Sequence, residues 1–300
     1  MAGPMHDDEV STSIELVSRL LADQFPQWAD LPITPVRSAG TDHAIYRLGE
    51  EMSVRLPLRP SAAGQVEKEQ FWLPRLGPLL PCPISHPLGL GAPGQGYPWN
   101  WSVYAWLPGD NPPADDDMIS LAEDLARFVT ALHAIDPTGG PPPGRHNFGR
   151  GVPLAKRDAY TREAIAKSAG LIDIEAAAAA WEADLAAPAW SAPPVWVHGD
   201  LCPGNLLVAD GRLAGVIDFG GLAVGDPACD LIVAWNMLSG PAREAYRAAL
   251  GVDDATWARG RGWALSVALL QLPYYQYSNP VLAANSRQTI AAVLADHGLG

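Results

Sequence analysis

Three side chains in one short stretch of the chain could together act on a phosphate group. Asp200 closes a His-Gly-Asp triplet, Asn205 follows five residues later, and Asp218 opens an Asp-Phe-Gly triplet. Phosphoryl transfer requires a carboxylate beside the acceptor hydroxyl and oxygen ligands for the Mg²⁺ that bridges the phosphates. The residue types therefore predict phosphoryl-transfer chemistry. The alternative is that these side chains only satisfy the backbone of loops and turns.

A predicted hairpin lies between the two halves of this pattern. Residues 206–208 and 213–217 favour strands, and Asp210-Gly211 between them is typical of a type I′ turn. A short strand at 195–197 precedes them. A strand, a loop and a hairpin in this order would bring the three side chains into one small volume. The whole pattern, with its hairpin, is a far more specific signal than an Asp-Phe-Gly triplet alone.

With this hairpin, segment 198–220 resembles the catalytic loop of the aminoglycoside phosphotransferase and choline kinase family, which is related to the eukaryotic-type protein kinases. His-Gly-Asp stands where protein kinases have His-Arg-Asp, which favours a small-molecule kinase. Residues 225–231, Gly-Asp-Pro-Ala-Cys-Asp-Leu, agree with the Gly-Asp-Pro-x-x-Asp-Leu of that family. The short segment after Asp218 and the missing Ala-Pro-Glu disfavour a protein substrate.

The resemblance implies a role for each of these residues. Asp200 would be the catalytic carboxylate, which hydrogen-bonds the acceptor hydroxyl and takes its proton. Asn205 and Asp218 would hold Mg²⁺, and ATP, or GTP as an alternative, would be the co-substrate. Structural support is expected from His198, which would brace the loop, and from two further carboxylates that cap a helix or brace the catalytic loop, Asp226 and Asp230.

The same resemblance assigns the phosphate contacts to the N-terminal region. The loop at 38–43 would approach the phosphates through backbone N–H groups and the Thr41 hydroxyl. Arg55 stands where the family has a lysine, and its guanidinium can still pair with phosphate oxygens. Its partner would be Glu67 or Glu69, of which Glu69 matches the family position. The substitution leaves two alternatives open, a surface arginine and a non-catalytic nucleotide-binding pseudokinase.

Residues 101–109 resemble the hinge between the two lobes of this family. Backbone groups of Ala105 and Leu107 would bond adenine, with Tyr104 behind it. Recognition through the main chain tolerates almost any side chain, so this assignment depends on position in the sequence. The alternative is an ordinary buried strand.

The acceptor site is expected between the catalytic loop and the C-terminal helices. The aromatic run at 274–277 could bind an amine through cation–π contacts or simply pack. The acceptor implied by the resemblance is an aminoglycoside-type antibiotic, and the alternatives are a macrolide, a choline-like amino alcohol and a sugar. A carboxylate-lined trough would favour a polyamine sugar, a deep apolar funnel a macrolide, and an aromatic box a quaternary amine. The acceptor candidates are Trp235, Asn236, Tyr274, Tyr275 and Tyr277.

The order of the predicted elements, together with the resemblance, indicates an α+β, two-lobed, protein-kinase-like fold. Residues 1–107 would form a nucleotide-binding lobe, a small antiparallel sheet with one helix, and the hinge would lie at about 104–109. Residues 108–300 would form a mainly helical catalytic and acceptor-binding lobe. The predicted strands lie at 33–36, 44–48, 52–56, 88–90 and 101–107, and the predicted helices lie at 11–25, 64–76, 118–132, 154–187, 227–238, 241–250, 254–272 and 281–297.

Composition narrows the possible partners. The chain has 300 residues, is 48% hydrophobic, and carries 33 Asp and Glu against 20 Lys and Arg, a net charge of −13. This balance argues against nucleic acid or an anionic membrane surface as the main partner and is compatible with a cationic acceptor. The acidic start without an apolar segment leads us to expect a cytoplasmic protein. We expect it to be a monomer or a homodimer. The three widely spaced cysteines suggest neither a disulfide framework nor a zinc site.

Overall fold

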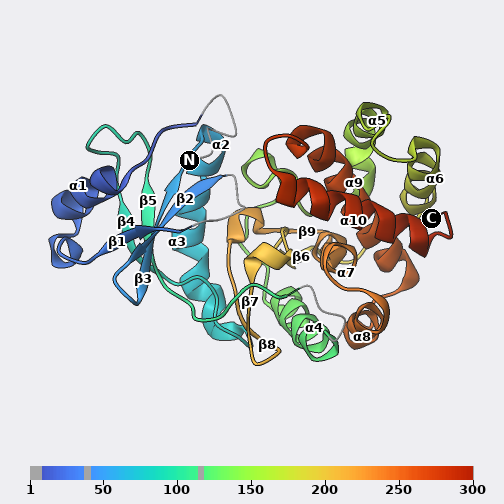
Figure 1. Cartoon of the computed structure of the whole chain (residues 1–300). Coiled ribbons are helices and arrows are strands. Elements are labelled where there is room, and N and C mark those ends of the chain that lie inside the picture. The colour runs from blue at the N-terminus through green and yellow to red at the C-terminus, as the bar shows by residue number, and fades with distance from the viewer. Residues whose placement is uncertain (1–8, 37–41, 114–117, 300) are drawn as a thin grey trace.

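The computed structural model describes residues 9–36, 42–113 and 118–299. The N-terminal part forms a five-stranded antiparallel sheet in the order β1-β2-β3-β5-β4, and it lies beside a larger, mainly helical region (Figure 1). The strands are β1 (Ile33–Pro35), β2 (His43–Leu48), β3 (Met52–Pro57), β4 (Pro87–Gly91) and β5 (Trp101–Ala105). These bounds agree closely with the predicted strands. Thr41 lies outside the described residues.

The sheet separates its two faces by the alternation of side chains along each strand. On β3, Val54 and Leu56 point into an apolar core, whereas Arg55 points to the opposite face. Helix α1 (Ile14–Gln24) covers the apolar face, and its start is capped by the Ser13 side chain, which accepts a hydrogen bond from Leu16 N at 3.2 Å.

The other face meets α3 (Gln65–Leu76), which lies between the sheet and the helical region (Figure 1). A one-turn helix, α2 (Pro60–Ala63), precedes α3. The described part of this region therefore holds three α-helices, where the predicted lobe held one. The fold-class prediction left out α1, although the helical period at 11–25 indicated it.

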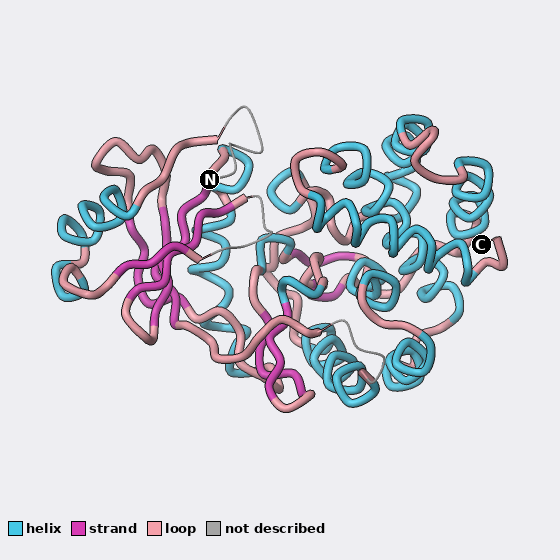
Figure 2. Tube along the Cα trace, viewed as in Figure 1, coloured by secondary structure: helices cyan, strands magenta, loops and turns pink. Residues whose placement is uncertain are grey.

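The C-terminal part contains most of the helices and two short two-stranded sheets set among them (Figure 2). One pairs β6 (Val195–Val197) with β9 (Ala223–Gly225), and the other pairs β7 (Leu206–Ala209) with β8 (Arg212–Val216). Between β7 and β8, Asp210 and Gly211 have φ values of 51° and 73°. Two successive positive φ values are the requirement of the predicted type I′ turn. The helices are α4 (Ile119–Ala134), α5 (Asp158–Lys167), α6 (Ile174–Leu185), α7 (Val233–Asn236), α8 (Gly240–Leu250), α9 (Asp254–Tyr275) and α10 (Pro280–Asp296).

Two predicted helices are interrupted in the structure. The predicted stretch 154–187 breaks between α5 and α6, where Gly170 has a left-handed backbone with a φ of 79° and Asp173 caps the new helix. The predicted helix 227–238 begins as a 3₁₀ segment, Pro227–Ile232, before the single turn of α7. The described residues contain no helix that is both long enough and apolar enough to cross a membrane.

Candidate active site

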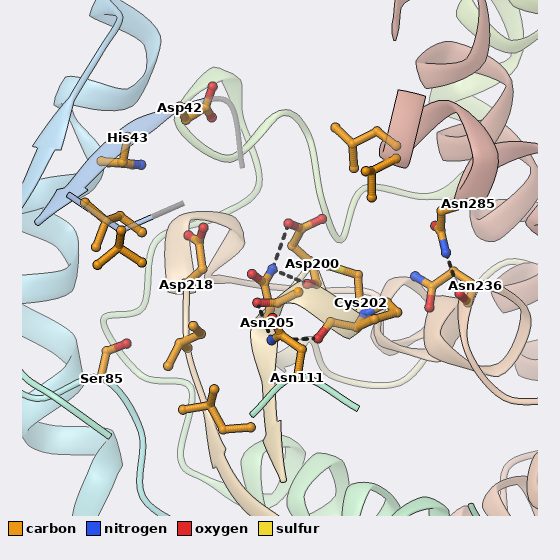
Figure 3. A pocket seen from close by; sticks show the side chains of 18 of the residues that line it. Asp42, His43, Ser85, Asn111, Asp200, Cys202, Asn205, Asp218, Asn236 and Asn285 are labelled. Atoms are coloured by element: carbon orange, nitrogen blue, oxygen red, sulfur yellow. Dashed lines mark hydrogen bonds between the residues drawn. The ribbon is translucent and has the colours of Figure 1, made fainter. Parts of the chain in front are cut away.

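A cavity of about 650 Å³ lies between the sheet and the helical region. The sheet contributes Arg55 and Tyr104 to its lining, and the opposite side contributes Asp200, Asn205 and Asp218. Figure 3 shows Asn205 between the two aspartates in this view. The structure therefore brings the three residues of the sequence pattern to one cavity, because the loop after β6 and the end of β8 meet there.

The catalytic-loop candidate is fixed by its own asparagine. Nδ2 of Asn205 donates hydrogen bonds to the backbone oxygen of Asp200 at 2.9 Å and to its Oδ2 at 3.1 Å. The Asp200 side chain keeps 40% of its surface exposed and can meet a second molecule. Because Nδ2 is engaged, Oδ1 is the atom of Asn205 that can face a cation.

Asp218 is held in an uncommon backbone conformation at the end of β8. Its φ is 62°, and its Oδ1 accepts hydrogen bonds from Gly220 N at 3.3 Å and from Nη2 of Arg55 at 2.5 Å. Burial by itself would raise the pKa of the Asp218 carboxyl, but the charge of Arg55 lowers the pKa below its usual range. The group is therefore a carboxylate at neutral pH, and its hydrogen bond with Arg55 uses Oδ1.

The oxygen atoms of Asn205 and Asp218 suit Mg²⁺ better than a metal ion that is coordinated by protein side chains alone. The described residues contain no group of three or more His, Cys, Asp or Glu side chains arranged for a metal ion. Mg²⁺ is commonly bound by one or two protein oxygens, with water and phosphate oxygens completing its octahedral shell. Asn205 Oδ1 and Asp218 Oδ2 form such a partial set.

Arg55 connects the two sides of the cavity. Its Nη1 donates to both carboxylate oxygens of Glu69 at 3.2 Å, while its Nη2 contacts Asp218. Burial would lower the pKa of Arg55, but Asp218 and Glu69 raise it, so the guanidinium stays charged. Of the two partners considered from the sequence, Glu67 is exposed and accepts from Asn100 Nδ2 at 2.6 Å instead. Arg55 is thus a buried, two-sided ion-pair residue and is not a surface arginine.

The Asp230 carboxylate supports the backbone of the catalytic loop through hydrogen bonds. It accepts hydrogen bonds from Gly199 N at 2.7 Å and from His198 N at 3.0 Å. His198 in turn accepts from Asp200 N through Nδ1 and lies 3.2 Å from Ile217 O through Nε2. With Nδ1 accepting, the proton is on Nε2, and the ring links the loop of Asp200 to Ile217, the residue before Asp218.

Asp226 both caps a helix and closes a buried ion pair. Its Oδ1 accepts from Ala228 N at 3.0 Å, at the start of the 3₁₀ segment, and its Oδ2 accepts from Arg259 Nε at 3.0 Å. Both side chains are 3% exposed. Asp226 therefore supports the chain after the loop and does not contact the cavity.

The hinge residues line the cavity, with one restriction on how they can bind a base. Ala105 and Leu107 are in its lining, and Tyr104 is buried behind them with its hydroxyl hydrogen-bonded to Glu69. The N–H of Ala105 donates to His86 O at 2.9 Å. A base would therefore meet the carbonyl of Ala105 and not its N–H group.

The predicted acceptor residues are only partly brought together. Tyr275 and Asn236 line the cavity, whereas Trp235 is buried with its ring 4.7 Å from that of Trp257. Tyr274 and Tyr277 are 56% and 89% exposed and do not line it. Consecutive helical residues point in directions about 100° apart, so a run of aromatics cannot all face one cavity.

Two residues near Asp200 carry no signal in the sequence. Arg150 lies in a Pro- and Gly-rich segment, and its Nη2 is 3.4 Å from Asp200 Oδ1. Asn111 uses its Nδ2 to donate to the carbonyl oxygens of Pro203, Gly204 and Leu206, and so holds the loop that contains Asn205. Neither residue belongs to a motif or a period, because each contact depends on the tertiary fold.

Comparisons with known proteins agree with this geometry. The phosphotransferase enzyme family matches residues 33–263. An aminoglycoside 3′-phosphotransferase of Escherichia coli is 30% identical over 127 residues, a match that spans 39% of this chain and 43% of that relative.

Solved structures share the fold over nearly the whole chain. The GDP and kanamycin complex of APH(2″)-IIIa superimposes with a TM-score of 0.74 at 20% identity, covering 93% of this chain and 98% of that one. A macrolide 2′-phosphotransferase of Brachybacterium faecium gives a TM-score of 0.61 at 22% identity, covering 93% and 97%. The expected fold class is confirmed. The chain belongs to the phosphotransferase enzyme family.

Proposed function

We propose that this protein transfers the γ-phosphate of ATP or GTP to a hydroxyl group of a small molecule in the presence of Mg²⁺. The observation that carries the proposal is the meeting of Asp200, Asn205 and Asp218 at one cavity, opposite Arg55. If these side chains only satisfied the backbone of their loops, there would be no reason for Asp200 to be partly exposed beside Asp218, whose pKa is lowered.

Each residue has a part in the proposed reaction. Asp200 would accept a hydrogen bond from the acceptor hydroxyl, orient its oxygen and receive its proton as transfer proceeds. Asn205 and Asp218 would hold Mg²⁺, which when bound neutralises charge on the phosphates. The Arg55 guanidinium keeps Asp218 ionised and can offer its planar N–H groups to phosphate oxygens. Glu69 fixes the orientation of Arg55.

The nucleotide would occupy the part of the cavity beside the hinge. Apolar side chains from both sides line this part, among them Ile45, Leu107, Leu207 and Ile217, which suits a planar base. The APH(2″)-IIIa structure holds GDP, so GTP belongs in the assay beside the ATP expected from the sequence. The hinge lies at 104–109 in this proposal, with the lobe boundary near 107.

The names of the relatives give two classes of acceptor. The aminoglycoside-type antibiotic expected from the sequence is supported by the Escherichia coli relative and by the kanamycin complex, and a macrolide by the Brachybacterium faecium enzyme. Either activity would make the protein an antibiotic-resistance transferase. The assay panel therefore contains aminoglycosides, macrolides, amino alcohols and sugars.

Replacing the proposed catalytic carboxylate tests the function. We expect Asp200→Asn to lower kcat with any accepted hydroxyl compound by about 10²–10⁴-fold, the usual contribution of a positioned base, while nucleotide binding measured by calorimetry is retained. Asp210→Asn, in the hairpin turn, makes the same change away from the cavity, and we expect it to keep full activity.

Two outcomes would contradict the proposal. Asp200→Asn with near wild-type transfer would remove Asp200 from its role. Nucleotide binding without turnover of any compound in the panel, and without hydrolysis of the nucleotide by water, would favour the non-catalytic nucleotide-binding module.

A further inference from the structure

The side of the cavity that faces the C-terminal helices has a distinct composition. We call the residues that α7, α9 and α10 contribute to the cavity lining the acceptor wall. Its members contain no Asp, Glu, Lys, Arg or His. They are apolar residues such as Val267 and Leu282, together with uncharged polar residues, Asn236, Gln271, Asn285 and Thr289.

The lack of charge on this wall is not a property of the chain as a whole. The net charge of the chain is −13, and α9 itself carries Arg259 and Arg261. Those arginines pair with Asp226 and Asp184 and are directed away from the cavity. The wall is therefore uncharged although α9 carries charged residues elsewhere along its length.

Four carboxylates line the rest of the cavity, all of them outside the acceptor wall: Asp42, Asp110, Asp200 and Asp218. Asp42, Asp200 and Asp218 pair with Arg59, Arg150 and Arg55, so among the described residues only Asp110, beside the hinge, lacks a paired arginine. A molecule with several ammonium groups would lose water on entering the cavity and would find no carboxylate on the acceptor wall. Burial of an unpaired ammonium group is strongly unfavourable.

The wall offers neutral hydrogen-bonding groups instead. Asn236 is 9% exposed, and its Nδ2 donates to Leu201 O at 3.0 Å. Its Oδ1 has no hydrogen-bond partner within the part of the chain that the structure describes. Asn285 Nδ2 donates to the backbone oxygen of Asn236 at 2.8 Å and holds this turn in place (Figure 3). The cavity lining thus contains three carboxamide side chains, Asn236, Gln271 and Asn285, which are neutral hydrogen-bonding groups.

From the uncharged wall and its carboxamide side chains we infer that the acceptor is an amphiphilic alcohol, with a bulky, mainly apolar body, several neutral oxygens and at most one positive charge. This inference rests on the proposed function, since it names the substrate class of the same site. A polyammonium sugar is the class that it rejects. Apolar surface on Val267 and Leu282 would bind the body, and the carboxamides would bind its oxygens.

Equilibrium binding tests the class without requiring turnover. We expect a macrolide with one amino sugar to bind the wild-type protein, in the presence of a non-hydrolysable nucleotide analogue, at least about tenfold more tightly than kanamycin. Kanamycin binding equally or more tightly would overturn the inference, and so would failure of both probes to bind. Transfer assays run in parallel report on the proposed function separately: efficient phosphorylation of kanamycin would uphold the function and overturn the acceptor class.

A charge placed on the wall provides the matched variant. Gln271→Glu is nearly isosteric and keeps an oxygen for the hydrogen bond from Ser286 Oγ. We expect it to move the ratio of the two dissociation constants by about tenfold toward kanamycin, because a carboxylate within a few ångströms stabilises an ammonium group. Gln288→Glu, on the exposed side of α10, adds the same charge and should leave the ratio unchanged. Equal effects of the two variants would show that the wall does not select the acceptor.

Discussion

Arg150 is a basic side chain in direct contact with the proposed catalytic carboxylate. Its guanidinium lies 3.4 Å from Asp200 Oδ1, is only 12% exposed, and approaches the ring of Trp263 at 5.9 Å. Asn205 holds the other oxygen of the same carboxylate. Between them, Arg150 and Asn205 limit the rotation of Asp200, which is why we regard Arg150 as a positioning residue.

This role predicts a change in turnover without a change in nucleotide affinity. We expect Arg150→Met to lower kcat by about tenfold, since a misplaced catalytic group loses orientation and not binding, and to leave KM for the nucleotide unchanged. Arg150→Lys keeps a cation near Asp200 and should recover part of the loss. Steady-state kinetics at saturating acceptor separates these effects. A raised nucleotide KM with normal kcat would instead place Arg150 in nucleotide binding.

The sequence predicted the site residues that lie close together along the chain and missed those that reach the site only through the tertiary fold. Asp200, Asn205 and Asp218 are separated by one loop and one hairpin, so their spacing carries the information. Arg150 and Asn111 reach the same loop from distant segments, and no spacing rule connects them with it. Glu69 could be preferred over Glu67 only by resemblance, because a choice between two positions of one helix depends on which face meets the sheet.

At the scale of elements, the site depends on a close crossing of two loops. The loop of Asp200 and the loop after Asp218 pass each other at Gly199 and Gly221, where a Cβ on Gly221 would lie 2.6 Å from His198 O. Gly199 has a φ of 80°, and a Cβ there would lie 2.6 Å from Gly221 O. Only glycine at both positions allows the backbones to approach this closely.

Separating the two loops should therefore damage the site and the fold together. We expect Gly221→Ala to lower kcat by about 10²-fold, because shifts of this size misplace catalytic groups, and to reduce the free energy of unfolding by about 1–3 kcal/mol through overpacking. Gly64→Ala serves as the control, since a Cβ there meets nothing within 4 Å. Normal kinetics for Gly221→Ala would mean that the crossing can relax without moving Asp218.

Helices, strands and turns were predicted correctly where a single local preference of the sequence determines the structure. Asp210-Gly211 sets its turn by backbone preference alone, and α1 follows its apolar period. The stretch 154–187 failed because its alanines favour helix throughout, whereas the break falls at Gly170 and the cap at Asp173. The run at 274–277 does not form an aromatic wall, because Tyr274 and Tyr275 point in different directions from α9 and Tyr277 lies beyond the end of that helix.

At the scale of the whole molecule, polar contacts join the sheet region to the helical region. Arg55 reaches Asp218 from β3, and Lys68 reaches the same loop from α3. The Lys68 ammonium donates to Gly220 O at 2.7 Å and to Leu222 O at 3.1 Å. Two carbonyl oxygens satisfy two of its N–H groups but supply no full counter-charge, so burial lowers the pKa of Lys68 to about 8.

This lowered pKa predicts how the stability of the molecule changes with pH. Lys68 has an ordinary pKa of 10.5 and a folded pKa of about 8, so between these values the unfolded chain binds more protons than the folded one. Stability contributed by this group must therefore rise with pH across the interval and be lost as pH falls through 8. The unfolding free energy of the wild type relative to Lys68→Met should increase by up to roughly 3 kcal/mol between pH 7 and pH 11. Denaturant titrations of both proteins over this range measure the difference, and a difference that stays constant, or falls with pH, would show that the Lys68 ammonium is not penalised by its position between the two regions.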